Sequence, residues 1–374
     1  MALLHLAVAA GFDVTVATVD HGLRPEAADE AAMVARTCAA LGVPHRVLHW
    51  RWDGRGNLSD AARRGRIALL SDWAAGQGVD TVCLGHTRDD VAETLLMRRD
   101  RGAGVDGLAA MAPLRQVGAV RILRPLLRIG RAELRDWLAA RGILWADDPT
   151  NEDDRYARAR IRKELARAGG VEGLAVIAEG YALLRAALDD AALRAIGDGV
   201  RLDRGDVLIR SDALGRLGKE GLRRILQAAL VWIASAEYGP RGASLDRFAQ
   251  AVAQGRPALL SGVVARQSRG TVRLTREWRA VAATQAEVGT PWDGRWQVTG
   301  PENKGLTLRA LGAGGLALCP DWRSTSLPRL SLLASPSVWA GERLVAAPLA
   351  APHPDWTATA RLPEGLLRRA ALSH

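Results

Sequence analysis

Short β-branched runs alternate with helix-forming runs through the first part of the chain, and this alternation constrains the fold more than any other feature. Strand-like runs occupy residues 13–19, 45–50, 79–85 and 120–124, and helix-forming runs occupy residues 25–41, 58–76 and 131–141. A repeated strand–helix order is typical of parallel strands joined by crossover helices. We therefore expect an α/β protein whose first domain is a doubly wound parallel sheet.

The pattern changes twice after this α/β part. A polar stretch and a basic helix close it near residue 166, a region rich in Ala, Leu and Arg extends to residue 256, and short strands with turn residues follow. The sequence thus predicts an α/β domain over residues 1–166, a helical region over 167–256 and a small α+β region over 257–374. No motif indicates a role for residues 285–374.

The opening run MALLHLAVAAG is apolar like a secretory signal but lacks the positively charged start that such a signal needs. We interpret it as a buried helix that ends at Gly11, where a C-terminal cap belongs. No apolar run approaches the ~20 residues that span a bilayer. The three scattered cysteines form no disulfide or zinc pattern, which favours a reducing cytoplasm.

Two of the predicted strands end in an imidazole. Asp20 and His21 follow the first strand-like run, and His86 follows the run at 79–85. Ligands of open α/β sheets bind in the crevice outside the carboxyl ends of the strands. One such histidine alone is often a packing or capping residue, but two at one sheet edge indicate a binding crevice.

Acidic residues follow His86 at the start of the next predicted helix. Asp90 and Glu93 are three residues apart and share one helix face, so together they can hold Mg²⁺ or an ammonium group. Asp89 in the same turn is interpreted as an ordinary complement to the helix dipole.

Arginine-rich segments add a basic surface to a chain whose formal net charge is +10. The residues selected as polyanion contacts are Arg101, Arg155, Arg158, Arg160, Arg162 and Lys163. Such side chains track phosphates, although each taken alone is typical of a solvated surface. The alternate arginines in RARIR cannot all sit on one helix face, so some are expected to face a ligand and others solvent.

Several of these segments together resemble the bacterial tRNA(Ile)-lysidine synthetases, which belong to the PP-loop ATP pyrophosphatases. The matching stretches are VDHGLRPEAADEA at 19–31, GHTRDDVAETLLMR at 85–98, RGAGVDGLAAM at 101–111, RPLL at 124–127 and DDPTNEDDRYARARIR at 147–162. The resemblance is specific over about 1–165 and looser over 217–279, where YGPR and LTREW look like the family's RNA-contacting part.

This resemblance implies a Rossmann-like ATPase fold and a two-step reaction that needs ATP and Mg²⁺. ATP adenylates the wobble cytidine of tRNA(Ile) with a CAU anticodon and releases pyrophosphate, and L-lysine then displaces AMP. The resemblance also implies that Asp20, His21 and His86 serve the ATP site and that Asp90 and Glu93 hold the lysine. The basic residues selected above as polyanion contacts would then contact tRNA. Residues 167–256 would be a helical tRNA-contacting region. A cytoplasmic enzyme is implied, and homodimers are frequent in the family.

The sequence departs from the family's pattern in two places. Ala159 replaces the amide of the usual RNRIR, and the phosphate-binding SGGxDS loop occurs nowhere in the sequence. That loop and the central first strand of the sheet would precede MALLHLA, so we expect the first strand to be missing. Met1 is then an internal methionine of a protein longer by about 20–30 residues, enough for one strand and a loop. Catalysis by the chain as given is expected to need that loop.

Three interpretations remain open. The chain is either a lysidine-forming enzyme or a non-catalytic RNA-binding remnant without the phosphate loop. Another PP-loop tRNA-modifying enzyme is the third interpretation, but thiolases depend on paired cysteines and amidotransferases on an N-terminal glutaminase cysteine. The sequence contains neither feature.

Overall fold

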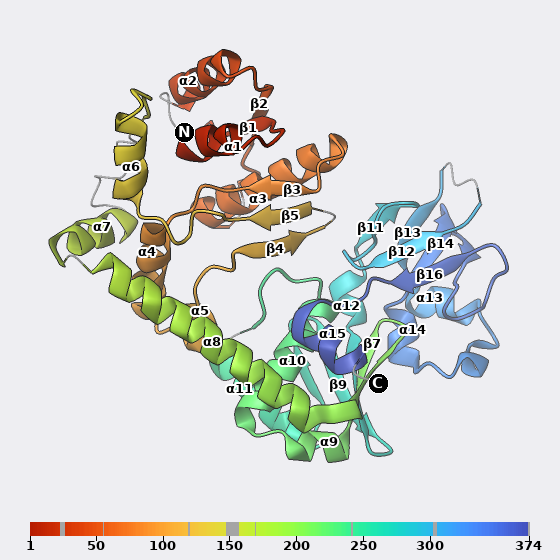
Figure 1. Ribbon diagram of the computed structural model, residues 1–374. Coiled ribbons are helices and arrows are strands. Elements are labelled where there is room, and N and C mark those ends of the chain that lie inside the picture. The colour runs from red at the N-terminus through yellow and green to blue at the C-terminus, as the bar shows by residue number, and fades with distance from the viewer. Residues whose placement is uncertain are drawn as a thin grey trace. The chain divides into compact units, whose positions relative to one another are not determined.

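The structure is a computed structural model that describes residues 1–22, 27–54, 56–118, 120–146, 157–168, 170–240, 242–301 and 305–372. The chain divides into two compact units, Met1–Arg185 and Ala186–His374, with the division inside helix α8 (Val171–Ile196). Figure 1 shows the order of the elements along the chain. The three-part division at residues 166 and 256 stays a prediction.

The first unit consists of short strands separated by helices, as the alternation of its sequence predicts. Its strands are β1 (Val16–Asp20), β2 (His45–His49), β3 (Thr81–Cys83), β4 (Leu114–Val117) and β5 (Val120–Leu123). Its helices are α1 (Ala2–Ala9), α2 (Ala27–Ala40), α3 (Leu58–Gly76), α4 (Arg88–Arg99), α5 (Val105–Leu108), α6 (Arg131–Ala139), α7 (Ala157–Ala168) and the first part of α8.

The strands of the first unit form two sheets in the part of the chain that the structure describes. β1 pairs in parallel with β2, while β3 pairs in parallel with β5, and β5 pairs antiparallel with β4. The parallel pairings agree with the predicted α/β class. No described strand links β1 to β3, so the single sheet expected from the sequence is not seen there. The missing first strand of the family's fold stays a prediction.

Helix α1 ends as predicted, since Gly11 follows it with a φ of +77°, but the helix is not buried. None of its residues is buried, and all five residues of β1 are only partly buried. The prediction of a buried helix was therefore wrong. Apolar side chains lie all round α1, so neighbours that contact one side of it leave the others open.

The second unit is built on antiparallel sheets. Its strands are β6 (Val200–Asp203), β7 (Asp206–Arg210), β8 (Ala258–Leu260), β9 (Val263–Ser268), β10 (Thr271–Arg276), β11 (Gln285–Glu287), β12 (Trp296–Thr299), β13 (Thr307–Ala310), β14 (Pro336–Ala340), β15 (Arg343–Ala346) and β16 (Thr357–Ala360). Its helices are α9 (Ser211–Arg216), α10 (Lys219–Ile233), α11 (Gly242–Ala253), α12 (Trp278–Val281), α13 (Gly312–Ala317), α14 (Arg329–Leu333) and α15 (Gly365–Leu372), with 3₁₀ turns η2 (Gly197–Gly199) and η3 (Trp322–Thr325).

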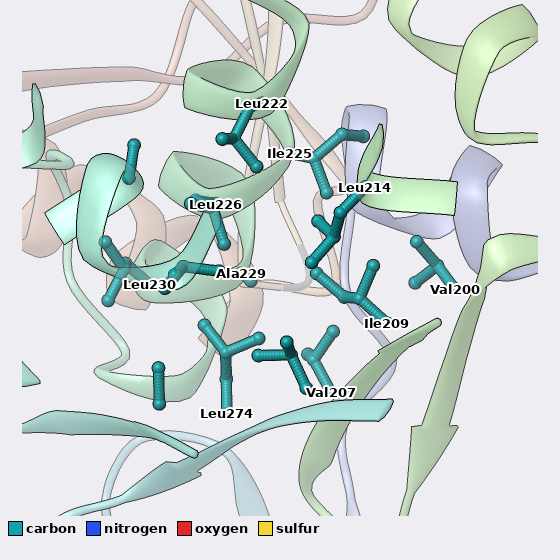
Figure 2. Packing of buried hydrophobic residues seen from close by; sticks show 14 of the residues in the cluster. Val200, Val207, Ile209, Leu214, Leu222, Ile225, Leu226, Ala229, Leu230 and Leu274 are labelled. Carbon is teal, nitrogen blue, oxygen red and sulfur yellow. The ribbon is translucent and has the colours of Figure 1, made fainter. Parts of the chain in front are cut away.

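Two cores stabilise this second unit. In the first, α10 covers a five-stranded sheet ordered β6-β7-β10-β9-β8. Figure 2 shows Ile225 and Leu226 of α10 facing Val207 and Leu274 of the sheet. The second core lies between the sheet β11-β13-β14-β15 and the pair β12-β16, and it contains three buried tryptophans, Trp292, Trp296 and Trp356. Burial of such side chains contributes about 1.5–3 kcal/mol each.

One hairpin interrupts the region predicted to be helical. β6 and β7 are joined by Arg204 and Gly205, whose φ angles are +47° and +90°. Positive φ at both central residues is the geometry that favours two-residue hairpins. The alternating sequence VRLDRGDVLIR contains this signal, because a glycine follows the strand-like run at the turn.

Candidate functional site

His21 and His86 lie where the sequence predicts them, just past the carboxyl ends of β1 and β3. Each ring has one buried nitrogen, Nδ1, that has no hydrogen-bond partner among the described residues. A buried nitrogen without a partner costs free energy comparable to a lost hydrogen bond. Two such atoms at strand ends are suited to receive polar groups of a ligand.

Arg66 of α3 acts electrostatically on the histidines at both strand ends. The charge of Arg66 acts on both imidazoles: burial lowers the pKa of His21, and Arg66 lowers it further while Asp20 opposes them. Burial lowers the pKa of His86 to about 4, with Arg66 again adding to the effect. His86 is therefore a neutral imidazole at physiological pH, and it can donate or accept a hydrogen bond.

Arg66 was not selected from the sequence. Its Nε is buried without a partner among the described residues, and burial lowers the pKa of its guanidinium. A signal for it exists in the sequence, because Arg66 is spaced four residues from Leu70 and seven from Trp73. An arginine in register with the apolar stripe of a helix faces inward rather than solvent.

Asp90 is fixed by the first turn of α4. Its Oδ2 accepts hydrogen bonds from the Thr87 backbone N at 2.8 Å and from the Thr87 Oγ1 at 2.9 Å, which forms a capping box. Burial acts to raise the pKa of Asp90, but the Thr87 hydrogen bonds and the charges of Arg158 and Arg131 lower it overall. Asp90 is thus ionised, with its Oδ1 facing arginines.

Glu93 lies at the centre of an ion cluster and is only 1% exposed. Its Oε1 contacts Arg131 Nη2 at 3.0 Å and Arg162 Nε at 2.6 Å, and its Oε2 contacts Arg158 Nε at 2.6 Å. Arg158 also reaches Asp90 at 2.7 Å. We call Asp90, Glu93 and these three arginines the α4 ion cluster. It holds α7 against α4, together with Ile161 and Leu165, which pack on Ala92 and Leu96.

Asp89 caps the N-terminus of α6 rather than complementing the dipole of its own helix, α4. Its Oδ2 accepts a 2.7 Å hydrogen bond from the backbone N of Arg131, the first residue of α6. A carboxylate at a helix N-terminus is stabilised by the unpaired N–H groups there. Asp89 therefore complements the dipole of α6 and fixes the arginine that contacts Glu93.

The predicted tRNA contacts separate into two groups. Arg158 and Arg162, four residues apart on α7, face the carboxylates of α4, whereas Arg160 is exposed on another side of the helix. Arg101 is exposed after α4, and Lys163 is half-buried. Arg155 lies outside the described residues. Ala159, the departure from RNRIR, is buried.

A metal site is not formed by the described side chains, since no group of three or more His, Cys, Asp or Glu residues among them comes together to hold an ion. The carboxylates of α4 bind arginines and a helix N-terminus instead. These residues do not fit Mg²⁺. No helix in the described ranges is long and apolar enough to cross a membrane.

Comparisons with known proteins match most of the chain. The PP-loop domain family matches residues 1–168. A tRNA(Ile)-lysidine synthase of Ruegeria pomeroyi is 49% identical over 364 residues, covering 96% of this chain and 87% of that protein. Its counterpart in Rhizobium meliloti is 34% identical and covers 84% of this chain and 72% of that protein. A solved U34-tRNA thiolase of Methanococcus maripaludis aligns with a TM-score of 0.41 at 18% identity, covering 49% of this chain and 67% of that one.

Proposed function

The chain belongs to the tRNA(Ile)-lysidine synthase family, tRNA-modifying enzymes with a PP-loop ATP-binding domain, and on that premise we propose that it joins L-lysine to the wobble cytidine of tRNA(Ile). The base oxygen attacks the α-phosphorus of ATP and pyrophosphate leaves. The ε-amine of lysine then attacks the base carbon that bears this oxygen, and AMP leaves with the oxygen. The proposed enzyme works in the cytoplasm on tRNA with a CAU anticodon, and a homodimer is part of this proposal.

The observation that carries the proposal is the α4 ion cluster, whose members Asp90 and Arg158 act electrostatically on His86. An amino acid has both a cationic and an anionic group. Two carboxylates and three guanidiniums in one cluster supply partners for both. Asp90 and Glu93 are the partners proposed for the ammonium groups of lysine, and the arginines for its carboxylate.

Lysine must compete with arginines for these carboxylates. Each oxygen of Glu93 contacts a guanidinium within 3.0 Å. Arg158 is 45% exposed, so it is the member of the cluster with the best access to solvent and to an RNA phosphate. We propose that tRNA phosphates draw Arg158 away from Glu93 and open this carboxylate to the lysine ammonium.

The nucleotide is proposed to bind at the strand ends. His21 and His86 present Nδ1 atoms that have no partner among the described residues, and the positive charge of Arg66 acts on both imidazoles. Asp20 borders the same edge. These groups fit the polar atoms and phosphates of ATP. Mg²⁺ remains part of the proposed reaction by analogy with the family, and no described residue is assigned to it.

Exposed basic residues supply the proposed RNA contacts. Arg101 and Arg160 are exposed, and Lys163 lies on the same helix as Arg160. Charges of this kind bind phosphates without reading sequence. Arg155 is proposed as a further contact from the sequence resemblance alone.

The alternative function is RNA binding without catalysis. Another PP-loop tRNA-modifying activity is a second alternative, and the exposed Cys83 has no described cysteine partner for sulfur transfer.

The deciding experiment measures AMP release by the 374-residue chain with ATP, L-lysine and a tRNA(Ile) transcript. The proposed ligase releases AMP only when all three substrates are present, and the product nucleoside carries lysine. Binding of tRNA without AMP release at any protein concentration refutes catalysis by this chain and leaves the RNA-binding alternative. Release of AMP that is independent of lysine indicates another PP-loop activity.

A further inference from the structure

The five-stranded sheet of the second unit has two faces of opposite character. One face carries apolar side chains, among them Val207, Ile209 and Leu274, which pack under α10 (Figure 2). Successive side chains of a strand point to opposite faces of a sheet, so the residues between these lie on the other face. Four of the residues on that other face are arginines, namely Arg201 on β6, Arg210 on β7, Arg273 on β10 and Arg266 on β9.

We call this second face the arginine face, and one of its ends is covered by α14. There the Ser331 Oγ donates a 2.5 Å hydrogen bond to Asp206 Oδ2 and accepts one from Thr275 Oγ1 at 3.3 Å. Asp206 and Thr275 are accordingly buried. The exposed residues at the other end of the face are Arg201, Arg210, Arg266 and Ser268. The open end of this face is therefore basic.

The pairing of the strands places three of the arginines in one row across the sheet. Arg201 lies opposite Leu208, which lies opposite Arg273 on its other side. Arg273 in turn lies opposite Arg266. Neighbouring strands are ~4.8 Å apart, so the row from β6 to β9 extends over roughly 14 Å. Since like charges directly opposite each other destabilise a sheet, an anion bound along this row would stabilise it.

Acidic residues of the second unit neutralise two of the four arginines. These pairs are Arg273 with Asp203 and Asp206, and Arg210 with Asp198 and Asp212. Arg201 and Arg266, in contrast, have no hydrogen-bond or ion-pair partner among the residues that the structure describes. The two ends of the row thus carry guanidiniums that can bind an external anion.

We propose that the open end of the arginine face binds the sugar-phosphate backbone of a double-stranded part of the RNA substrate. Guanidiniums bind phosphates, and hydroxyl groups such as those of Ser268 and Thr271 bind phosphate or ribose oxygens. The described strand residues of this face include no aromatic side chain on which an unpaired base could stack. The inference rests on the proposed tRNA-modifying function and names a surface of the second unit that holds the substrate.

The spacing of the charges favours a backbone over a small anion. Arg201 and Arg266 stand at opposite ends of the row, with Leu208 and the paired Arg273 between them. A single phosphate bound by one of these two arginines leaves the other without a counter-charge. A chain of phosphates neutralises both, and the counterions that it releases add to the affinity.

The test removes the two unpartnered charges from the full chain and measures RNA affinity as a function of salt by fluorescence anisotropy. Arg201→Ala combined with Arg266→Ala should weaken binding of an RNA duplex of unrelated sequence, and of the tRNA(Ile) transcript, by about tenfold or more. Each single variant should lower the slope of log K against log salt by about 1. Because both side chains are exposed and unpartnered among the described residues, the fold should not change.

Two further variants serve as controls. Arg201→Lys combined with Arg266→Lys keeps both charges and should restore most of the affinity, because phosphate contacts depend mainly on charge. Arg247→Ala removes one exposed charge from α11, which packs on the apolar face of the same sheet. It is the matched control for each single variant and should leave RNA binding unchanged.

Each outcome decides the proposal. Weaker duplex binding with a smaller salt slope, restored by the lysine variant and absent in Arg247→Ala, supports it. Unchanged affinity and slope in the double variant overturn it. An equal loss in Arg247→Ala also overturns it, because net charge would then set the affinity. A loss confined to a single-stranded oligoribonucleotide overturns the duplex assignment. ATP and lysine are omitted from these measurements, so the result does not depend on AMP release and the two proposals fail separately.

Discussion

Substitution Glu93→Gln tests whether the α4 ion cluster holds α7 in place. Gln keeps the size of the side chain but removes the charge that three guanidiniums share. Removing one partner of a buried ion pair costs about 3–5 kcal/mol. The three arginines are between 21% and 45% exposed, so solvent recovers part of this cost. We therefore expect a loss of about 2–3 kcal/mol of local stability.

Hydrogen exchange of peptides is the suitable assay, because two compact units need not unfold together. A loss of this size corresponds to exchange of the α4 and α7 amides that is roughly 30- to 140-fold faster. Glu164→Gln on α7 is the matched control, since Glu164 is exposed and its loss should change exchange little. Exchange of α7 in Glu93→Gln that equals the wild type would refute the view that this cluster fastens α7 to α4.

Three further predictions follow from the same geometry. Asp90→Asn removes a charge from the proposed lysine site and should raise the lysine KM by about tenfold or more in the AMP-release assay, while normal lysine kinetics would contradict the assignment. The folded-state pKa of His86, about 4, lies below its ordinary value of 6.5, so the unfolded chain binds the proton first as the pH falls. Stability should therefore fall between about pH 6.5 and pH 4. Over this pH range the His86→Gln variant should lose roughly 2–3 kcal/mol less stability than the wild type, as measured by urea unfolding followed by circular dichroism. Identical pH profiles of the variant and the wild type would argue against a neutral buried His86. Gly65→Ala should displace Trp50, because a Cβ at residue 65 would lie 1.9 Å from the Trp50 Nε1. The substitution should destabilise the first unit by about 1–3 kcal/mol, measured by hydrogen exchange of the α3 amides. Unchanged exchange would show that the indole can shift freely.

Local sequence patterns located most elements of the first unit. The helix predicted over 58–76 is observed as Leu58–Gly76, and the helix after His86 starts at Arg88 behind its Thr87 cap. Such features depend on residues within a few positions of one another, because capping and helix periodicity are local. For the same reason the sequence placed His21 and His86 correctly at strand ends.

Partners that are distant in the sequence were not predictable in this way. Glu93 meets Arg158 and Arg162 from 65 and 69 positions away, and no local pattern states which charges will pair. The sequence indicated carboxylates open to a cation, whereas the structure shows them already bound by arginines. Arg66 was overlooked because its neighbours Arg63 and Arg64 make it look like part of a solvated basic run.

The sequence by itself determined the α/β class, the positions of the helices in the first unit and the family to which the chain belongs. Only the tertiary structure decided that β1 and β3 lie in separate sheets within the described residues, that Glu93 is enclosed by three arginines and that Trp50 rests on Gly65. The physical reason is the separation in sequence between the residues that interact. Helices and turns are specified by neighbouring residues, whereas ion clusters and aromatic contacts form only when chain folding brings distant side chains together and removes water from between them.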